Sequence, residues 1–445
     1  MIGVDVVQIA RMEKTYAKPH FQHSIFTEAE RCYIEHSPHP IAAAAGIYAA
    51  KEAFAKALGV GMYPHLFSDV EVMHANNGRP ALQAKGVFGD MLAKENKTAM
   101  LSITHDAGVA VAVCVLENKN KVQMLSAPFV QAKDLIYHQE LALSLLRRDL
   151  RGYKTQYGKV ALVGGSRGMA GSICLAAYAA LRSGAGLVYV VVPESLVPIV
   201  QNKMLEGIVK GVSDEGTGHF TQASLPDILA AINDCTSVAI GPGMGRFPDA
   251  SNLIATLLQE QKAPFVLDAD ALNAIAKQTA ALRTASQAVV LTPHEMEMSR
   301  LIGLSVKQVQ EARDTVASRF AKDYASYVVL KGDHTVITDG NSLHHNPSGT
   351  PGMATAGAGD VLTGMMAAFL GYGYPTMTAA RLACDFHGIA GEFAAADKGE
   401  ESMIASDIVA HIPNAFRWFE ALRAEGEKGE EHAESDARGS LFCRS

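Results

Sequence analysis

One acidic residue, Asp360, lies in a glycine-rich stretch, GTPGMATAGAGDVLTG (349–364), that runs directly into apolar sequence. We predict a loop that enters the N-terminus of a helix. Bare backbone, free N–H groups and the helix dipole make such a loop a cradle for a phosphate group. Because a carboxylate repels phosphate, Asp360 is predicted to take a proton from a hydroxyl beside a phosphoryl group in transfer. The alternative is that Asp360 is only the helix N-cap.

Polar residues also follow several apolar runs. YVVLKGDHTVI places Lys331 after such a run, LTPHEMEMSRL places His294 and Glu295, and LDADALNA places Asp268 and Asp270. The ammonium of Lys331 could reach a nucleotide phosphate. Taken singly, each residue is equally well a cap or a solvated surface group, and we expect Asp268, Asp270 and Asn273 to be supporting polar residues or caps.

The glycine-rich turns in KVALVGGSRGMAGS and AIGPGMG do not fit the dinucleotide-binding pattern GxGxxG with an acid about twenty residues further on. From about residue 159, apolar runs alternate with helix-length stretches. This alternation predicts a doubly wound, mainly parallel α/β sheet. Its strands are apolar throughout because both faces of such a sheet are covered. Ligands of these sheets bind at the strand ends, where the polar residues lie.

A different pattern occupies the first segment, where β-branched runs flank helical stretches and predict a small α+β unit. Thr27 and Glu30 have the spacing of a capping box, and a helix over 41–58 is expected to end at Gly59. The chain is too long for one ordinary core. We predict a first domain over 1–120, a linker over 121–131, a second domain over 132–423 and a disordered charged tail over 424–445.

Candidate chemistry in the small unit centres on Asp5, in an apolar strand, and on Glu52 and Lys56, on a helix. A buried acid is costly unless it is paired or bound to a cation. Asp5 and Glu52 could give Mg²⁺ its two protein carboxylates. Lys56 lies on the same helix face as Glu52, so a plain salt bridge between them explains that pair equally well.

Composition favours a cytoplasmic protein with reduced cysteines. The chain has 445 residues, a net charge of −7 and six widely spaced cysteines without a CxxC motif. These features favour neither a disulfide framework nor a zinc site. The start of the chain lacks the pattern of a signal peptide, and no apolar run is long enough to span a bilayer. We expect no membrane and no nucleic-acid partner.

The larger segment resembles the NAD(P)H-hydrate dehydratase family of the ribokinase-like superfamily. The resemblance covers roughly 130–420 and is carried, in order, by VGGSRGMAGS, RSGAGLV, AIGPGMG, VLDADALNAI, LTPHEME, VVLKGDHTVI and NPSGTPGMATAGAGDVLTG. It implies removal of water from the hydrated nicotinamide ring of NADHX or NADPHX, with ADP or ATP as co-substrate. Phosphorylation of the ring hydroxyl would create the leaving group.

The same resemblance implies roles for individual residues, with the amides of 357–360 as an anion hole and Asp360 activating the ring hydroxyl. The hydrated dinucleotide is assigned to Ser172, Gly243, His294 and Asp360, and the adenine nucleotide to Lys331, Gly332, Asp333, His334, Thr335 and Gly359. Ser172 stands where much of the family has Ala, which is a small departure.

Residues 1–117 resemble a holo-[acyl-carrier-protein] synthase, through IGVDVVQIARME, FTEAE, AGIYAAKEAFAKALG, DVEVMHANNGRPAL and LSITHDAGVAVAVCVLE. The resemblance implies transfer of 4′-phosphopantetheine from coenzyme A to a serine of acyl carrier protein. It implies Mg²⁺ on Asp5 and Glu52, Lys56 near the phosphates and His105 lining the site, and places Arg11 toward the acidic carrier protein. Ile47 stands where many members have Arg, which puts affinity in doubt more than chemistry.

Two alternatives stay open. The larger unit could be a kinase of the same superfamily that phosphorylates a vitamin precursor and keeps the phosphate on its product. The small unit could be a weakly catalytic module that oligomerises and binds coenzyme A or carrier protein. By resemblance we expect a homo-oligomer built on trimers. No segment resembles the epimerase that usually partners the dehydratase.

Overall fold

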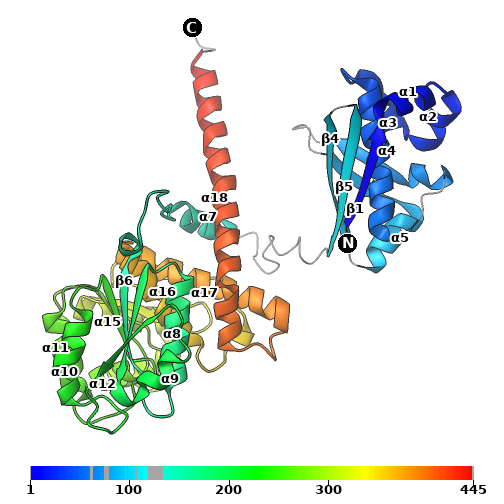
Figure 1. The fold of residues 1–445 in the computed structure, drawn as a ribbon. Helices are drawn as coiled ribbons and strands as arrows, with labels where there is room; N and C mark the ends of the chain where they lie inside the picture. Colours follow the sequence, from blue (N-terminus) through cyan, green and yellow to red (C-terminus); the bar gives the residue numbers. More distant parts are fainter. Residues whose placement is uncertain are drawn as a thin grey trace. The chain divides into compact units, whose positions relative to one another are not determined.

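The computed structural model describes residues 2–60, 64–74, 80–95, 97–106, 108–118 and 134–442, with the backbone alone for 64–66, 74, 117–118 and 425–442 (Figure 1). It divides the chain into two compact units, Met1–Ser126 and Ala127–Ser445. The linker predicted over 121–131 lies outside the described residues. The predicted domain limits of 1–120 and 132–423 therefore stay predictions.

The smaller unit is an α+β domain, as the sequence predicts. Its main sheet has the order β1-β5-β4 and is antiparallel, and a second pair joins β2 to β3. The strands are β1 (Ile2–Gln8), β2 (Val70–His74), β3 (Pro80–Ala84), β4 (Lys97–Asp106) and β5 (Val109–Asn118). The helices are α1 (Ile9–Tyr16), α2 (Pro19–Ile25), α3 (Glu28–His36), α4 (Pro40–Leu58) and α5 (Gly86–Lys94).

Helix α4 is the central helix of this unit, and it packs against β1, β4 and β5. Its alanines are buried along most of its length, which lets the helix lie close to the sheet. The helix ends at Gly59, whose φ of 71° is left-handed, and Thr27 forms the predicted capping box with Glu30 at the start of α3. Both sequence predictions are confirmed.

The larger unit contains one nine-stranded sheet of order β14-β13-β12-β11-β10-β9-β6-β7-β8. All neighbouring strands from β12 to β8 in this order run parallel to each other. At the other edge, β13 pairs antiparallel with β12, and β14 pairs antiparallel with β13. The strands are β6 (Lys159–Val163), β7 (Leu187–Pro193), β8 (Ile208–Val212), β9 (Ser237–Ile240), β10 (Phe265–Leu267), β11 (Val289–Leu291), β12 (Tyr327–Leu330), β13 (Val336–Thr338) and β14 (Leu343–His345). The predicted doubly wound α/β fold is confirmed.

Helices cover both faces of this sheet (Figure 1). Along β6, Val160 and Leu162 join one core while Ala161 and Val163 join the other, which is the two-residue period of a strand buried on both sides. The first core contains α7 (Leu135–Leu143), α8 (Ala170–Arg182), α16 (Ala358–Tyr372), α17 (Thr376–Lys398) and the start of α18 (Ala405–Phe442). The second contains α10 (Leu225–Ile232), α11 (Ala250–Glu260), α12 (Asp270–Ile275), α13 (Glu295–Ile302), α14 (Val306–Glu311) and α15 (Arg313–Tyr324). Helix α9 (Val197–Gln201) lies beside β8.

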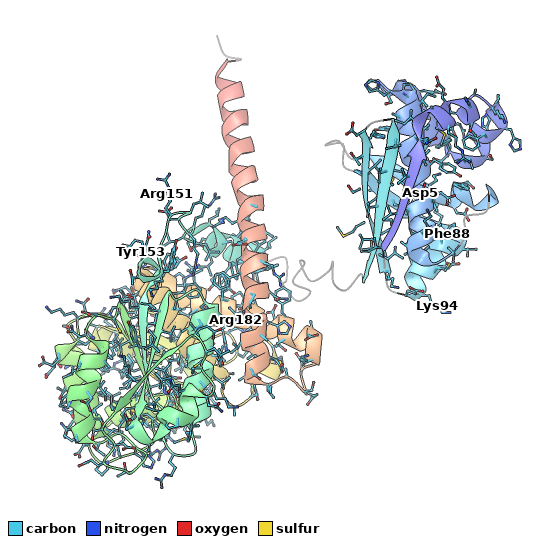
Figure 2. All side chains as sticks on the ribbon, viewed as in Figure 1. Asp5, Phe88, Lys94, Arg151, Tyr153 and Arg182 are labelled. Carbon is cyan, nitrogen blue, oxygen red and sulfur yellow. The ribbon has the colours of Figure 1, made fainter. Side chains whose placement is uncertain are left out.

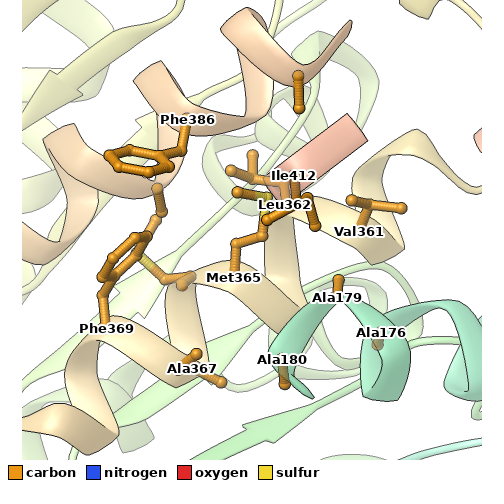
Figure 3. Packing of buried hydrophobic residues seen from close by; sticks show 14 of the residues in the cluster. Ala176, Ala179, Ala180, Val361, Leu362, Met365, Ala367, Phe369, Phe386 and Ile412 are labelled. Atoms are coloured by element: carbon orange, nitrogen blue, oxygen red, sulfur yellow. The ribbon is translucent and has the colours of Figure 1, made fainter. Parts of the chain in front are cut away.

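Helix α16 is buried on nearly all sides, as its apolar sequence requires. It packs against α8 and α17, and Ala176, Ala179 and Ala180 of α8 lie along the side that faces α16 (Figure 3). Gly364 allows the close crossing, because a Cβ there would lie 2.0 Å from the carbonyl oxygen of Ala176. This close crossing holds α16 against α8, and α16 also contacts β6 and β9 of the sheet.

Helix α18 continues to Phe442, which differs from the disordered tail that we expected over 424–445. Residues 424–442 include five glutamates and three alanines, which have high helix propensity, and also three glycines, which do not. High charge with few large apolar residues is thus compatible with a helix as well as with disorder. Within the described parts of the chain, no helix is both long and apolar enough to cross a membrane.

Candidate active sites in the two units

The strand order of the larger unit reverses between β6 and β9, and ligands of open α/β sheets bind at such a switch point. The loops that follow these strands meet there, since Gly165 donates its N–H to the carbonyl of Pro242 at 2.9 Å. The predicted polar strand ends and the glycine-rich loop converge on this edge of the sheet.

Asp360 is the third residue of α16, and the N-cap is Gly357, whose φ of 93° favours glycine. The alternative reading of Asp360 as the N-cap is therefore wrong. Its carboxylate instead accepts a hydrogen bond from the hydroxyl of Ser172 on α8. The N–H of Ala358 is bonded to the carbonyl of Thr355 at 3.3 Å, and the helical bonds begin with Val361 N–H to the carbonyl of Gly357 at 3.1 Å. The N–H groups between them, those of Gly359 and Asp360, are therefore the ones placed to face an anion.

The carboxylate of Asp360 is a weaker acid than usual. Burial, and then the negative charge of Asp268, raise its pKa to about 6, although Ser172 and Lys331 act in the opposite direction. A carboxylate with this pKa is ionised at neutral pH and accepts a proton more readily than an ordinary one. This is the property that a general base needs.

Asp268 is the centre of a buried network directly behind Asp360, with 1% of its surface exposed. One oxygen, Oδ1, accepts from Lys331 Nζ at 2.7 Å and from the hydroxyl of Thr292 at 2.8 Å. The other, Oδ2, accepts from the hydroxyl of Thr363 at 2.7 Å. We predicted Asp268 only as a supporting residue or a cap. The cost of burying an acid at the end of a fully apolar strand was the signal that could have revealed this network.

Lys331 lies between Asp268 and the glycine-rich loop. A Cβ built on Gly359 would lie 3.3 Å from Lys331 Nζ, so the ammonium faces the start of α16. Burial alone would lower the pKa of Lys331, but the carboxylates of Asp268 and Glu297 outweigh it and raise the pKa. The lysine is thus a fixed positive charge beside the predicted anion hole.

The remaining residues predicted to bind nucleotide lie after Lys331, between β12 and β13. Gly332, Asp333 and His334 are exposed, and Thr335 is half-buried. His334 has a left-handed φ of 49°, and its Nδ1 lies 3.0 Å from Asp333 Oδ1. They form an accessible turn next to the ammonium of Lys331, and our assignment of the nucleotide to this turn stays a prediction.

The other residues predicted to bind the dinucleotide lie in the loop after β9 and at the starts of α8 and α13. A Cβ on Gly243 would lie 2.9 Å from Ser172 Cβ, so the loop after β9 touches the start of α8. His294 is exposed and is the N-cap of α13. Burial, followed by the charge of Lys331, lowers its pKa. The structure therefore brings Ser172, Gly243, Asp360 and Lys331 to one edge, with His294 at its margin.

Glu297 is a functional candidate that the sequence analysis missed. It is 6% exposed, and its Oε2 lies 4.0 Å from Lys331 Nζ. Burial raises its pKa to about 7, although Lys331 lowers it. Glu297 lies three residues after His294, and the two form the capping box of α13. This spacing is the feature of the sequence that could have drawn attention to Glu297.

In the smaller unit, Asp5 of β1 (labelled in Figure 2) faces α4. Asp5 Oδ1 forms an ion pair with Lys56 Nζ at 2.7 Å, so this lysine pairs with Asp5 rather than with Glu52 of its own helix. Burial, and then the charge of Asp5, raise the pKa of Glu52, which also shares a hydrogen bond with Tyr48. Because the charge of Asp5 disfavours the ionised form of Glu52, a cation bound by both carboxylates would relieve this repulsion.

Other predicted residues of this unit lie further away. His105 is exposed and lies against Gly46, where a Cβ would be 2.7 Å from its Nε2. Gly46 is six residues before Glu52, which is about 9 Å along a helix. Arg11 is exposed on α1, whereas Ile47 is 1% exposed in the core, where a guanidinium would be costly.

Lys51, beside Glu52, has a structural role. It is fully buried and donates to Glu30 Oε2 at 2.7 Å and to the carbonyls of Ile25 and Phe67 at 2.8 and 2.9 Å. All three of its N–H groups are therefore used. Among the described residues, no group of three or more His, Cys, Asp or Glu side chains is placed to hold a metal.

Comparison with known proteins agrees with this geometry. Residues 160–414 match the model of the family described as NAD(P)H-hydrate dehydratase, and residues 1–114 match that of the 4′-phosphopantetheinyl transferase superfamily. The chain is 41% identical over 278 residues to the bifunctional NAD(P)H-hydrate repair enzyme Nnr of Moorella thermoacetica, covering 62% of this chain and 52% of that one. It is 34% identical over 263 residues to the ADP-dependent (S)-NAD(P)H-hydrate dehydratase of Xanthomonas campestris, covering 59% and 89%.

Among solved structures, the ADP/ATP-dependent NAD(P)H-hydrate dehydratase of Bacillus subtilis, co-crystallised with ATP and Mg²⁺, matches with a TM-score of 0.55 and 26% identity. That match covers 63% of this chain and 97% of the other. The chain spans about half the length of the first curated relatives that it matches. The family model alone covers more than half of the chain. The chain belongs to the NAD(P)H-hydrate dehydratase family, and its residues 1–114 match the model of the 4′-phosphopantetheinyl transferase superfamily.

Proposed function

We propose that the larger unit removes water from NADHX and NADPHX with ADP or ATP as the phosphoryl donor. The observation that carries this proposal is Asp360. Its carboxylate has a pKa near 6, is oriented by Ser172 and lies at the N-terminus of α16. A base beside an anion-binding helix end suits the transfer of a phosphoryl group to a hydroxyl.

In the first step, Asp360 takes the proton of the ring hydroxyl as the hydroxyl oxygen attacks the terminal phosphorus of the nucleotide. The bond from that phosphorus to the bridging oxygen breaks, and the shortened nucleotide leaves. The amides at the start of α16 and the ammonium of Lys331 stabilise the negative charge of the transferred group. In the second step, the phosphate leaves the ring with its bonding electrons and the neighbouring carbon loses a proton, which restores the double bond.

The competing reading, a kinase of the same superfamily, differs in its product. We would incubate the protein with NADHX, Mg²⁺ and either ATP or ADP, and follow phosphorus by NMR. The proposal predicts inorganic phosphate equal in amount to the NADH formed. A stable phosphate ester on the ring, without NADH, would support the kinase reading. Running the two nucleotides separately also identifies the donor.

We also propose that the smaller unit transfers 4′-phosphopantetheine from coenzyme A to acyl carrier protein, because Asp5, Glu52 and Lys56 meet between β1 and α4. Asp5 and Glu52 would hold Mg²⁺, which when bound neutralises phosphate charge. Lys56, half exposed, is placed to contact the phosphates of coenzyme A. Two carboxylates beside a half-exposed ammonium favour this function over a purely structural ion pair.

Mass spectrometry of an apo carrier protein tests this second activity. The wild-type chain with coenzyme A and Mg²⁺ should add one phosphopantetheine group. Glu52→Gln should lose the transfer, and Glu35→Gln, an exposed glutamate on α3, should keep it. An inactive wild type that still binds coenzyme A would favour the alternative of a binding module. Mass measurement of the intact assembly decides whether the chain is the trimer-based oligomer that we expect.

A further inference from the structure

A small cavity lies next to the catalytic edge of the larger unit. It has a volume of about 220 Å³ and lies between the loop after β9, helices α11 and α12, and Arg300 of α13. Sites for whole drug-sized ligands measure about 300–1,000 Å³. The cavity therefore fits one part of a larger ligand, such as a phosphate group with its sugar.

The lining of the cavity is positive. Arg246, Lys277 and Arg300 contribute three cations, and Asp270 contributes one acid. One oxygen of Asp270 is already engaged, because Oδ2 accepts from the N–H of Gly245 at 2.9 Å. Arg300 donates to the neutral amide oxygen of Asn273 at 2.7 Å. In the described part of the chain, none of these three cations forms an ion pair with an acid, so their charge is left for a ligand.

The cavity joins the catalytic edge on two sides. Gly245 is two residues beyond Gly243, which touches Ser172, and Asp270 is close enough to Asp360 to raise its pKa. On the other side, the charge of Arg300 contributes to the lowered pKa of His294. A dinucleotide whose ring lies at Asp360 and whose chain passes Gly243 would bring a phosphate to the cavity.

We propose that this cavity, through Arg246, Lys277 and Arg300, binds a phosphate group of the hydrated dinucleotide. The inference rests on the proposed dehydratase function. The phosphate has two possible sources. The pyrophosphate is present in both NADHX and NADPHX, whereas the phosphate on the adenosine ribose is present only in NADPHX. In both cases the guanidinium groups of the arginines and the ammonium of the lysine would donate hydrogen bonds to phosphate oxygens, so the recognition chemistry is the same.

The test uses Arg246→Gln and Lys277→Gln in the full chain, with Lys262→Gln as the matched control. Lys262 is exposed before β10, on the amino-terminal side of the sheet and away from the cavity. We would measure KM and kcat for NADHX and for NADPHX at saturating nucleotide. In parallel, calorimetry would measure the Kd of NAD⁺ and of NADP⁺.

We expect each cavity variant to raise KM and Kd by about ten-fold, as loss of one charged hydrogen bond does, with kcat unchanged. A rise for NADPHX and NADP⁺ alone identifies the ribose phosphate, and a rise for both dinucleotides identifies the pyrophosphate. KM and Kd within about two-fold of the Lys262→Gln control would overturn the proposal.

These outcomes are separable from a failure of the proposed function. If the wild type does not convert NADHX at all, the dehydratase proposal fails while the calorimetry still decides the cavity. NADP⁺ or NAD⁺ binding that weakens in the cavity variants and not in the control would then keep the phosphate site. Equal binding by all variants would remove it.

Discussion

Replacing Thr363 by valine should destabilise the larger unit without changing its packing. Thr363 is fully buried, and its hydroxyl donates to Asp268 Oδ2 at 2.7 Å. Valine has nearly the same shape but no donor, so Oδ2 of a buried carboxylate loses this partner. A hydrogen bond to a charged group contributes about 1.5–3 kcal/mol, and we expect the free energy of unfolding to fall by that amount. The loss stays below the ~3–5 kcal/mol of a broken buried ion pair, because Lys331 still holds Oδ1.

Tryptophan fluorescence during urea unfolding measures this change in the larger unit alone. The chain has one tryptophan, Trp418, which is 4% exposed and packs on His138 at a ring distance of 5.2 Å. Thr256→Val is the control, because the hydroxyl of Thr256 bonds only within α11, to the carbonyl of Asn252. A loss in Thr363→Val of less than about 0.5 kcal/mol, equal to the control, would refute the network around Asp268.

Two further stability predictions use the same logic. Lys51→Met should destabilise the smaller unit by about 3–5 kcal/mol, because it leaves Glu30 buried without its cation. Circular dichroism should show that the smaller unit unfolds at a lower urea concentration, while the unfolding transition reported by Trp418 fluorescence stays unchanged. Asp360→Asn should stabilise the larger unit at neutral pH. The pKa of Asp360 is about 6 in the folded protein and has its ordinary value of 3.8 in the unfolded chain, so the folded protein binds the proton more tightly. The stability of the wild type therefore falls as the pH rises from 3.8 to about 6. The gain in the Trp418 transition should reach at most ~3 kcal/mol above pH 7 and shrink toward pH 4, and a gain independent of pH would contradict the assigned pKa.

Local patterns in the sequence were enough for much of the fold. Apolar runs ending in polar residues predicted the parallel strands, and the glycine-rich loop predicted the helix that begins beside Asp360. These features depend on neighbouring residues only. The capping box at Thr27 and the helix end at Gly59 were predictable for the same reason.

Contacts between distant segments were not predictable in this way. Asp268, Thr292, Lys331 and Thr363 form one network only because β10, β11 and β12 end, and α16 begins, at the same edge of the sheet. Lys56 was expected near Glu52 on its own helix, but β1 brings Asp5 within 2.7 Å of it. The pattern of a helix or strand does not specify which partner lies across from it.

The most direct test of the central claim measures the recovery of the near-ultraviolet absorbance of reduced nicotinamide. The wild-type chain, Asp360→Asn and the control Asp234→Asn, an exposed acid before β9, would each receive NADHX, Mg²⁺ and ADP or ATP. We predict recovery with the wild type and the control, and a rate about 10²–10⁴-fold lower for Asp360→Asn, as expected for loss of a general base. A rate for Asp360→Asn within about ten-fold of the wild type would contradict the role of Asp360.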